Sequence, residues 1–234
     1  MRPRRDRFLG ATEQVNDGFP HPPLIVELYE QYLVHQETEL FVEQAAERYG
    51  VATLERLSEW GSRTARRGAV LALGLCGEYS SNPVMGRALL DEDRGVRTLA
   101  DGGIRNLWRR VGSTADREQL DRVAELTADK QFSEAVELAT QLVRQSPWFA
   151  EAWNQRALAL FNLGEYDESI RDCHQTLEIN PYHFPAATGM GKCYLQLNNR
   201  AAALESFRRA LRLNPGLDDV RAHVVFLQRA LKEE

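Results

Sequence analysis

The side chains that could do chemistry in this chain of 234 residues are few and far apart. The candidate nucleophiles and metal ligands among them are five histidines and three cysteines, namely His21, His35, His174, His183, His223, Cys76, Cys173 and Cys193. None stands in an HExxH, CxxC or GxSxG motif, and no glycine-rich phosphate loop occurs. The neighbours Cys173 and His174 lack the further ligands that a zinc site needs. We therefore predict no catalytic residues, no metal, no cofactor and no enzymatic activity.

The cysteines also indicate a compartment. They are odd in number and not closely paired, which argues against a disulfide framework and for a reducing environment, with Cys173 and Cys193 as buried structural thiols. Residues 1–22 contain no apolar run of signal-peptide length, and no stretch is long and apolar enough to span a membrane. We expect a cytoplasmic protein with no membrane partner, whose residues 1–22 form a flexible tail.

Arginines are the one charged feature that could form a binding surface. The formal net charge of −5 disfavours nucleic-acid binding as the main activity, but residues 61–113 hold nine arginines against five acids. A basic face there could contact phosphates or an acidic partner. Its candidate residues are Arg63, Arg66, Arg94, Arg97, Arg105 and Arg109. The favoured interpretation is an internal ladder of arginine–aspartate pairs between repeat units, beside a solvated face.

The acids of this region allow two interpretations of their own. Asp91, Glu92 and Asp93 are consecutive and could bind a cation. An acid-rich helix start, paired with Arg94 or Arg97, is favoured because negative charge stabilises the first turn of a helix.

Two internal repeats predict the helices that must position these side chains. The first has a period of 31 residues, and it predicts helices at 53–59, 63–76, 83–90 and 94–110. Apolar stripes at 24–33 and 41–49 predict two more helices before it. The run from Asp93 to Arg97, followed by Ala100 and Ile104, resembles the second helix of a HEAT repeat. Residues 23–112 are therefore predicted to be a HEAT-like region.

The second repeat has a period of 34 residues, marked by Pro147, Pro181 and Pro215. After a break at 112–116, it predicts helical hairpins at 116–149, 150–183 and 184–217 and a capping helix at 218–234. The middle unit resembles a tetratricopeptide repeat, with Trp153 opening its first helix, a Leu-Gly-Glu-Tyr turn at 163–166 and Pro181 closing its second helix. The first unit departs from this pattern, because it has no opening aromatic residue and carries Val123 at a small-residue position.

The resemblance implies a right-handed, all-α solenoid of stacked helical hairpins, with a concave groove lined by the first helix of each unit. By spacing, the groove candidates are Leu120, Ala124, Asn154, Gln155, Leu158, Phe161, Asn162, Thr188, Lys192, Leu195, Gln196 and Phe226. Apolar and amide side chains of this kind can bind a peptide backbone independently of its sequence. The alternative is that Leu158 and Phe161 pack against the neighbouring first helix or the capping helix.

One subtype of the family binds the carboxyl terminus of chaperones through a clamp of cationic and amide side chains. The matching positions here are Leu120, Ala124, Gln155, Pro185 and Gly189, and none of them can hold a carboxylate by charge-assisted hydrogen bonds. We therefore predict that this chain has no such clamp.

We accordingly predict a non-catalytic adaptor or scaffold that binds a protein or peptide partner in the concave groove. The alternative is binding of nucleic acid or an acidic partner through the arginine-rich face, with nucleic acid the less favoured partner. The tryptophans are predicted to be packing anchors, and they are Trp60, Trp108, Trp148 and Trp153.

Overall fold

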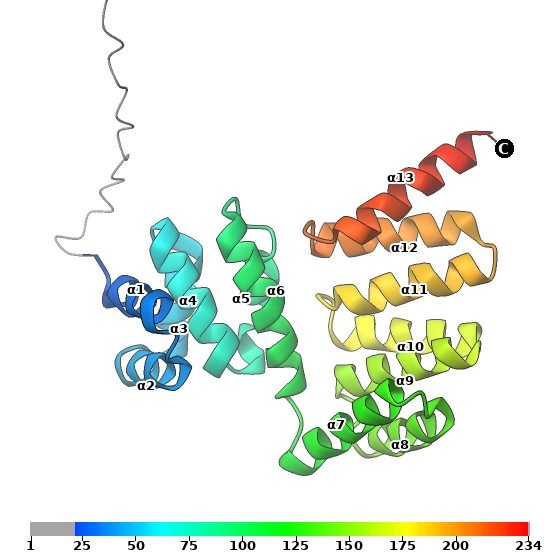
Figure 1. Cartoon of the computed structure of the whole chain (residues 1–234), viewed down its shortest axis with the longest axis horizontal. Coiled ribbons are helices and arrows are strands. Elements are labelled where there is room, and N and C mark those ends of the chain that lie inside the picture. The colour runs from blue at the N-terminus through cyan, green and yellow to red at the C-terminus, as the bar shows by residue number, and fades with distance from the viewer. Residues whose placement is uncertain (1–21, 234) are drawn as a thin grey trace, which may run out of the picture.

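A computed structural model describes residues 22–233, and the regular structure of that part of the chain is helical (Figure 1). The predicted tail, residues 1–22, lies outside the described residues except for Pro22. In chain order the helices are α1 (Leu24–His35), α2 (Thr38–Arg48), α3 (Val51–Trp60), α4 (Arg63–Cys76), the short η1 (Tyr79–Ser81), α5 (Asn82–Ala88), α6 (Arg94–Arg109), α7 (Thr114–Ala128), α8 (Phe132–Gln145), α9 (Ala150–Leu163), α10 (Tyr166–Ile179), α11 (Phe184–Gln196), α12 (Arg200–Leu213) and α13 (Asp218–Glu233). The prediction of an all-α fold built from helical hairpins is confirmed.

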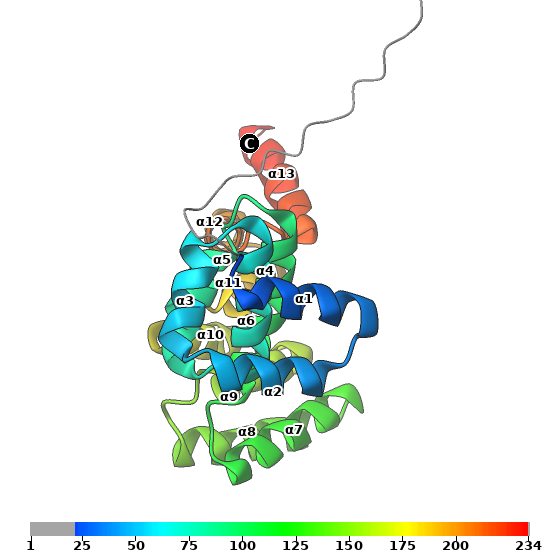
Figure 2. The same cartoon turned by 90° about the vertical axis from the view of Figure 1, so that its left-hand side faces the viewer.

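Helices α1–α6 form a first region around one apolar core. The pairs α3/α4 and α5/α6 correspond to the two copies of the 31-residue repeat, and the α1–α2 hairpin packs on α4 at the end of this stack (Figure 2). Each helix contributes fully or nearly buried apolar side chains, among them Ile25, Phe41, Leu54, Leu73, Met85 and Ile104. Helices α4 and α6 approach closely because Gly74 faces Gly103, where a Cβ atom on Gly74 would lie 2.7 Å from the Gly103 Cα. Any larger residue at either position must push these two helices apart.

Replacing Gly103 by alanine is therefore expected to destabilise the protein by about 1–3 kcal/mol through overpacking. The added Cβ atom would lie 2.8 Å from the Cα of Gly74. The matched control is Gly102→Ala in the same helix, where a Cβ atom would meet nothing within 4 Å and should stabilise the helix by about 0.5–1 kcal/mol. Urea unfolding followed by circular dichroism measures both variants, and equal shifts in the same direction would contradict the close helix contact.

Helices α7–α13 form a second region of three antiparallel hairpins and a final helix. The hairpins α7/α8, α9/α10 and α11/α12 occupy the 34-residue units, and α13 continues their register. The region begins at a capping box, in which the Ser113 side chain accepts from the Asp116 N–H and the Asp116 carboxylate accepts from the Ser113 N–H. Helix α9 ends at Gly164, whose φ of 84° requires glycine or a strained residue. Local sequence chemistry thus explains where these helices begin and end.

The second region turns back after α6, so that its hairpins lie alongside the first region (Figure 1). The turns that follow α10 and α12 make the contact. Asn82 Nδ2 donates to Asn180 Oδ1 at 2.9 Å, and Asn214 Nδ2 donates to Asp101 Oδ1 at 2.6 Å. Asn180 and Asn214 stand 34 residues apart, each directly before one of the repeat prolines. The same repeat position therefore docks twice onto the first region, and we call this contact the inter-region interface.

Aromatic side chains fill the inter-region interface. Trp108 of α6 is 2% exposed, and its ring stacks on His183 with 4.3 Å between centroids. Tyr182 packs on Gly86 of α5, where a Cβ atom would come within 2.1 Å of the tyrosine ring. Phe184 is fully buried and belongs to the core of the first region although it begins helix α11. The apolar core of the first region therefore extends across the interface into the second region.

The prediction that all tryptophans are packing anchors is wrong for two of them. Trp60 and Trp148 are 82% and 51% exposed, whereas Trp108 is buried and Trp153 is partly buried. Trp60 is the last residue of α3, where the helix ends at the surface rather than against a neighbour. The type of side chain alone did not reveal this difference in position.

Candidate functional site

The second region contains a cavity of about 1120 Å³ between α9, α11 and α13. Seven of the predicted groove residues line it, namely Asn154, Leu158, Phe161, Asn162, Thr188, Lys192 and Phe226. Leu158, Lys192 and Phe226 are equivalent positions in the 34-residue register. They therefore lie at the same height along α9, α11 and α13, respectively. Leu158 and Phe226 are 46% and 65% exposed, which leaves their apolar side chains available for contact.

The alternative of internal packing holds only in part. Phe161 is partly buried and lies 5.6 Å, between ring centroids, from Tyr166 at the start of α10. Leu158 is exposed, so the interpretation that it packs against a neighbouring helix does not hold for it.

Five predicted groove residues do not line the cavity: Leu120, Ala124, Gln155, Leu195 and Gln196. The prediction is wrong for Leu120, which is 1% exposed and packs in a core with Leu142 and Phe149. Leu120 packs there against α8 and the start of α9, and Leu195 is partly buried against the core of the later hairpins. The cavity thus involves the second and third hairpins and α13, but not the first hairpin.

A buried carboxylate, that of Glu151, orients the amide of Asn154 in the cavity and the amide of Gln155 beside it. Glu151 Oε1 accepts hydrogen bonds from Asn154 Nδ2 at 3.1 Å and from Gln155 Nε2 at 2.7 Å. Its Oε2 atom lies 2.9 Å from His183 Nε2, and His183 Nδ1 accepts from the Ala186 N–H, so Nε2 carries the proton and donates to Glu151. Burial alone would raise the pKa of the Glu151 carboxyl, but the hydrogen bonds from His183, Gln155 and Asn154 outweigh it and hold that pKa below its ordinary value. Glu151 is therefore an ionised anchor that connects the inter-region interface to Asn154 in the cavity.

The first region contributes one residue, Arg105 of α6, to the cavity lining. Its guanidinium lies 4.5 Å from the centre of the Phe184 ring, and its Nε lies 3.3 Å from Asp101 Oδ2. We predicted Arg105 on a separate basic face, since sequence spacing within one repeat region does not reveal contacts with the other. Its position is a consequence of the inter-region interface.

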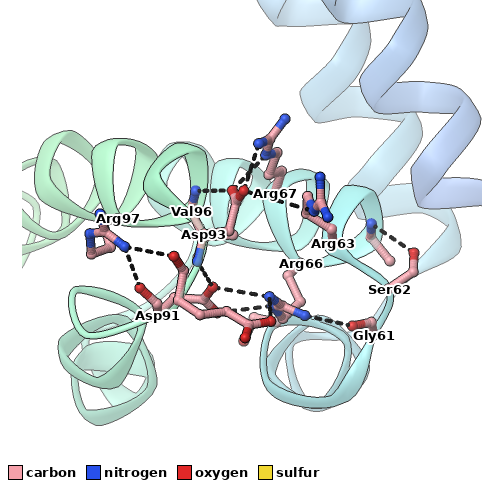
Figure 3. A network of polar contacts seen from close by, with 12 residues as sticks. Gly61, Ser62, Arg63, Arg66, Arg67, Asp91, Asp93, Val96 and Arg97 are labelled. Atoms are coloured by element: carbon pink, nitrogen blue, oxygen red, sulfur yellow. Dashed lines mark hydrogen bonds and ion pairs between the residues drawn. The ribbon is translucent and has the colours of Figure 1, made fainter. Parts of the chain in front are cut away.

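Of the remaining predicted basic residues, Arg63 and Arg66 form ion pairs between repeat units, as does their neighbour Arg67 (Figure 3). Arg66 forms a bidentate ion pair with Asp91, with hydrogen bonds of 2.9 and 3.0 Å. Arg67 forms a bidentate ion pair with Asp93, in which both hydrogen bonds are 2.7 Å long. Arg63 lies 4.0 Å from Asp93, and Arg109 pairs with Asp121. This is the arginine–aspartate ladder that we favoured over a free basic face.

The acid-rich run has different partners from those we predicted. Arg97 donates to the backbone carbonyls of Asp91 and Glu92, and the carboxylates bind arginines of the preceding α4 instead. Arg94 is exposed. The side chain of Asp93 also caps α6 by accepting from the Val96 N–H at 2.9 Å. The acids therefore start a helix, as expected, and also connect two repeat units.

Stability should depend on pH through Asp93. The hydrogen bonds from Arg67 lower the pKa of the Asp93 carboxyl to about 2, whereas the same group titrates near ~3.9 in an unfolded chain. Because the folded pKa is the lower one, the pair stabilises the fold by about 2 kcal/mol at neutral pH, and this is lost as the pH falls from about 4 to about 2. Asp93→Asn keeps a cap acceptor for Val96 but removes the charge. It should be about 2 kcal/mol less stable than the wild type at pH 7 and equally stable near pH 2, as measured by urea titrations at both pH values; the same deficit at both would contradict this.

The cysteines are free thiols in the structure. Cys173 and Cys193 are buried in the second region, and Cys193 Sγ lies 3.3 Å from Ser169 Oγ. Burial raises the pKa of both thiols, which keeps them protonated and unreactive. Across residues 22–233, no three histidine, cysteine or acidic side chains are grouped as a metal site. Within the same part of the chain, no helix has the length and apolarity needed to cross a bilayer.

Comparison with known proteins identifies the repeat that forms the second and third hairpins. Residues 150–183 and 185–217 each match a family model of the tetratricopeptide repeat. The chain therefore contains two tetratricopeptide repeats, at the second and third of the predicted units. The assignment of residues 116–149 to this repeat, and of residues 23–112 to HEAT-like repeats, stays a prediction.

Individual relatives cover part of the chain. A TPR repeat-containing protein of Rhizobium etli is 29% identical over 112 residues, which is 48% of this chain and 55% of that protein. The SGT1 homologue of Bos taurus is 34% identical over 96 residues, 41% of this chain and 28% of its own length. The chain thus aligns with little more than half of the one relative and less of the other.

A solved structure shares the fold of the second region. It is the first TPR of Spaghetti (RPAP3) bound to the HSP90 peptide SRMEEVD, and it is superimposed with a TM-score of 0.50. The sequences are 20% identical, and the match covers 52% of this chain and 97% of that domain. At this identity, the likeness concerns the fold alone.

Proposed function

We propose that this protein is a non-catalytic adaptor that binds a peptide or an extended segment of a protein in the cavity between α9, α11 and α13. The observation that carries the proposal is that the apolar side chains of Leu158 and Phe226 are exposed in a cavity of about 1120 Å³, beside the amides of Asn154 and Asn162. Apolar contacts supply affinity, while amides pair with the donors and acceptors of a peptide backbone. The free thiols support a cytoplasmic location.

The proposal is tested by selecting peptides from a phage-displayed random library on the intact protein and measuring the affinity of the enriched peptides by calorimetry. A variant with Asn154→Ala, Leu158→Ala and Lys192→Ala together should bind them about tenfold more weakly or worse, because two contacts worth about 1 kcal/mol each already exceed a factor of ten. The matched control is Leu163→Ala, because Leu163 is 41% exposed on the same helix α9 but does not line the cavity. Affinity that is equal in both variants would contradict binding in this cavity.

We also propose that the partner is not held by a carboxylate clamp. At the clamp positions, Leu120 is buried, Gln155 is bonded to Glu151, and Pro185 and Gly189 lack a polar side chain. The peptide SRMEEVD, present in the similar structure, is the appropriate probe. We expect no saturable binding by calorimetry up to about 1 mM peptide, an affinity limit near 4 kcal/mol. A micromolar dissociation constant would overturn this part of the proposal.

A further inference from the structure

The cavity carries unpaired charges of opposite sign at its two ends. Lys192 of α11 is exposed, and its ammonium makes no ion pair or hydrogen bond within residues 22–233. Asp219 in the first turn of α13 is likewise exposed and without such a partner in that range. Both side chains line the same cavity as the apolar Leu158 and Phe226.

The repeat register gives the separation of the two charges. Lys192 and Phe226 are equivalent residues, 34 apart, and therefore lie at the same level on the neighbouring helices α11 and α13. Asp219 precedes Phe226 by seven residues in α13, which corresponds to about 10 Å along the helix axis. The positive end of the cavity is therefore the end that holds Phe226, and the negative end lies about 10 Å away along α13.

The other charges near Asp219 compensate one another. Arg105 lies 3.3 Å from Asp101, and Asp218 lies 3.7 Å from Arg221. Asp219 is left as the uncompensated acid of that end. Stabilisation of the α13 N-terminus accounts for acids in its first turn, but it does not account for an isolated lysine among Leu158, Phe161 and Phe226.

We propose that the cavity selects a peptide that carries both charges. Such a peptide has an acidic residue next to an apolar residue and a basic residue about 10 Å further along. The apolar side chain inserts between Leu158 and Phe226, the acidic side chain pairs with Lys192, and the basic side chain pairs with Asp219. In an extended peptide that rises about 3.3 Å per residue, the acidic and basic residues are about three positions apart. This inference rests on the proposed function, since it names the chemistry of the guest for the same cavity.

The test uses random dodecapeptides displayed on phage and selected on the intact protein at about 50 mM salt, where charge pairs are weakly screened. The enriched peptides are expected to show an acidic–apolar pair and a basic residue at the stated spacing. For a synthesised consensus peptide, Lys192→Glu and Asp219→Lys should each weaken binding by about fivefold or more, and about 1 M salt should remove most of the difference. Selection on Lys192→Glu should enrich a basic residue in place of the acidic one.

Matched controls are Lys232→Glu and Asp129→Lys, which change the same charges at exposed positions outside the cavity and should leave affinity unchanged. Two adverse results are distinguishable. Peptides that require Leu158 but bind both cavity charge variants as tightly as the wild type would overturn this inference and leave the proposed function intact. Selection that yields no peptide dependent on Leu158 would overturn both.

Discussion

Replacing Trp108 by alanine is expected to lower the free energy of unfolding by about 3–5 kcal/mol, the largest effect of any single change discussed here. Trp108 is 2% exposed and donates from Nε1 to Asn82 Oδ1 at 2.7 Å. Its ring stacks on His183 and contacts Phe184, both from the second region. Alanine would leave a cavity in the inter-region interface and would remove the donor from Asn82, which is itself buried.

The measurement is urea unfolding, followed by far-ultraviolet circular dichroism and by proteolysis of the two regions. The control is Trp60→Ala, which removes the same side chain from a position that is 82% exposed and should cost less than about 0.5 kcal/mol. We expect the wild type to lose both regions in one transition and the Trp108→Ala variant to lose them in two. A single transition with an unchanged midpoint would show that the interface does not couple the regions.

Removing the carboxylate of Asp172 is expected to destabilise the protein by about 3 kcal/mol, because an arginine would be left largely buried without its counter-charge. Arg156 of α9 forms a bidentate ion pair with Asp172 of α10, in which both hydrogen bonds are 2.7 Å long. The side chains of Arg156 and Asp172 are 17% and 6% exposed. Arg156 also lies over the ring of Trp153, 4.9 Å from its centre. The pair thus joins the two helices of the hairpin that also lines the cavity.

Two comparisons separate the buried pair from ordinary surface charge. Glu205→Ala breaks the pair of Glu205 with Arg212, whose side chains are 64% and 61% exposed, and should cost at most about 1 kcal/mol. The double substitution Arg156→Met with Asp172→Leu should recover most of the stability lost in Asp172→Ala, since no unpaired charge remains. Thermal and urea unfolding measure all three variants. If Asp172→Ala costs no more than Glu205→Ala, the pair contributes nothing beyond a surface ion pair.

The helices could be predicted from the sequence because their causes are local. Spacing of 31 and 34 residues, a proline after a second helix and apolar stripes at helical period indicated nearly all of them, with ends that differ from the structure by only a few residues. Part of the cavity lining could be predicted in the same way, since Asn154, Leu158 and Lys192 follow from the register of one repeat onto the next. The prediction failed for Leu120, because that side chain is buried between the first hairpin and the start of α9.

The repeating hairpin, the position of its ends and the side chains that one hairpin presents to the next can therefore be derived from the sequence, because they depend on contacts between residues close in the chain. Long-range packing is responsible for the turn of the second region back onto the first, the docking of Asn180 and Asn214 there, and the position of Arg105 in the cavity. Those contacts join residues as many as 113 positions apart, and their free energy comes from burying surfaces such as that of Trp108 against His183. No periodicity within either repeat carries information about which two distant surfaces are complementary in shape.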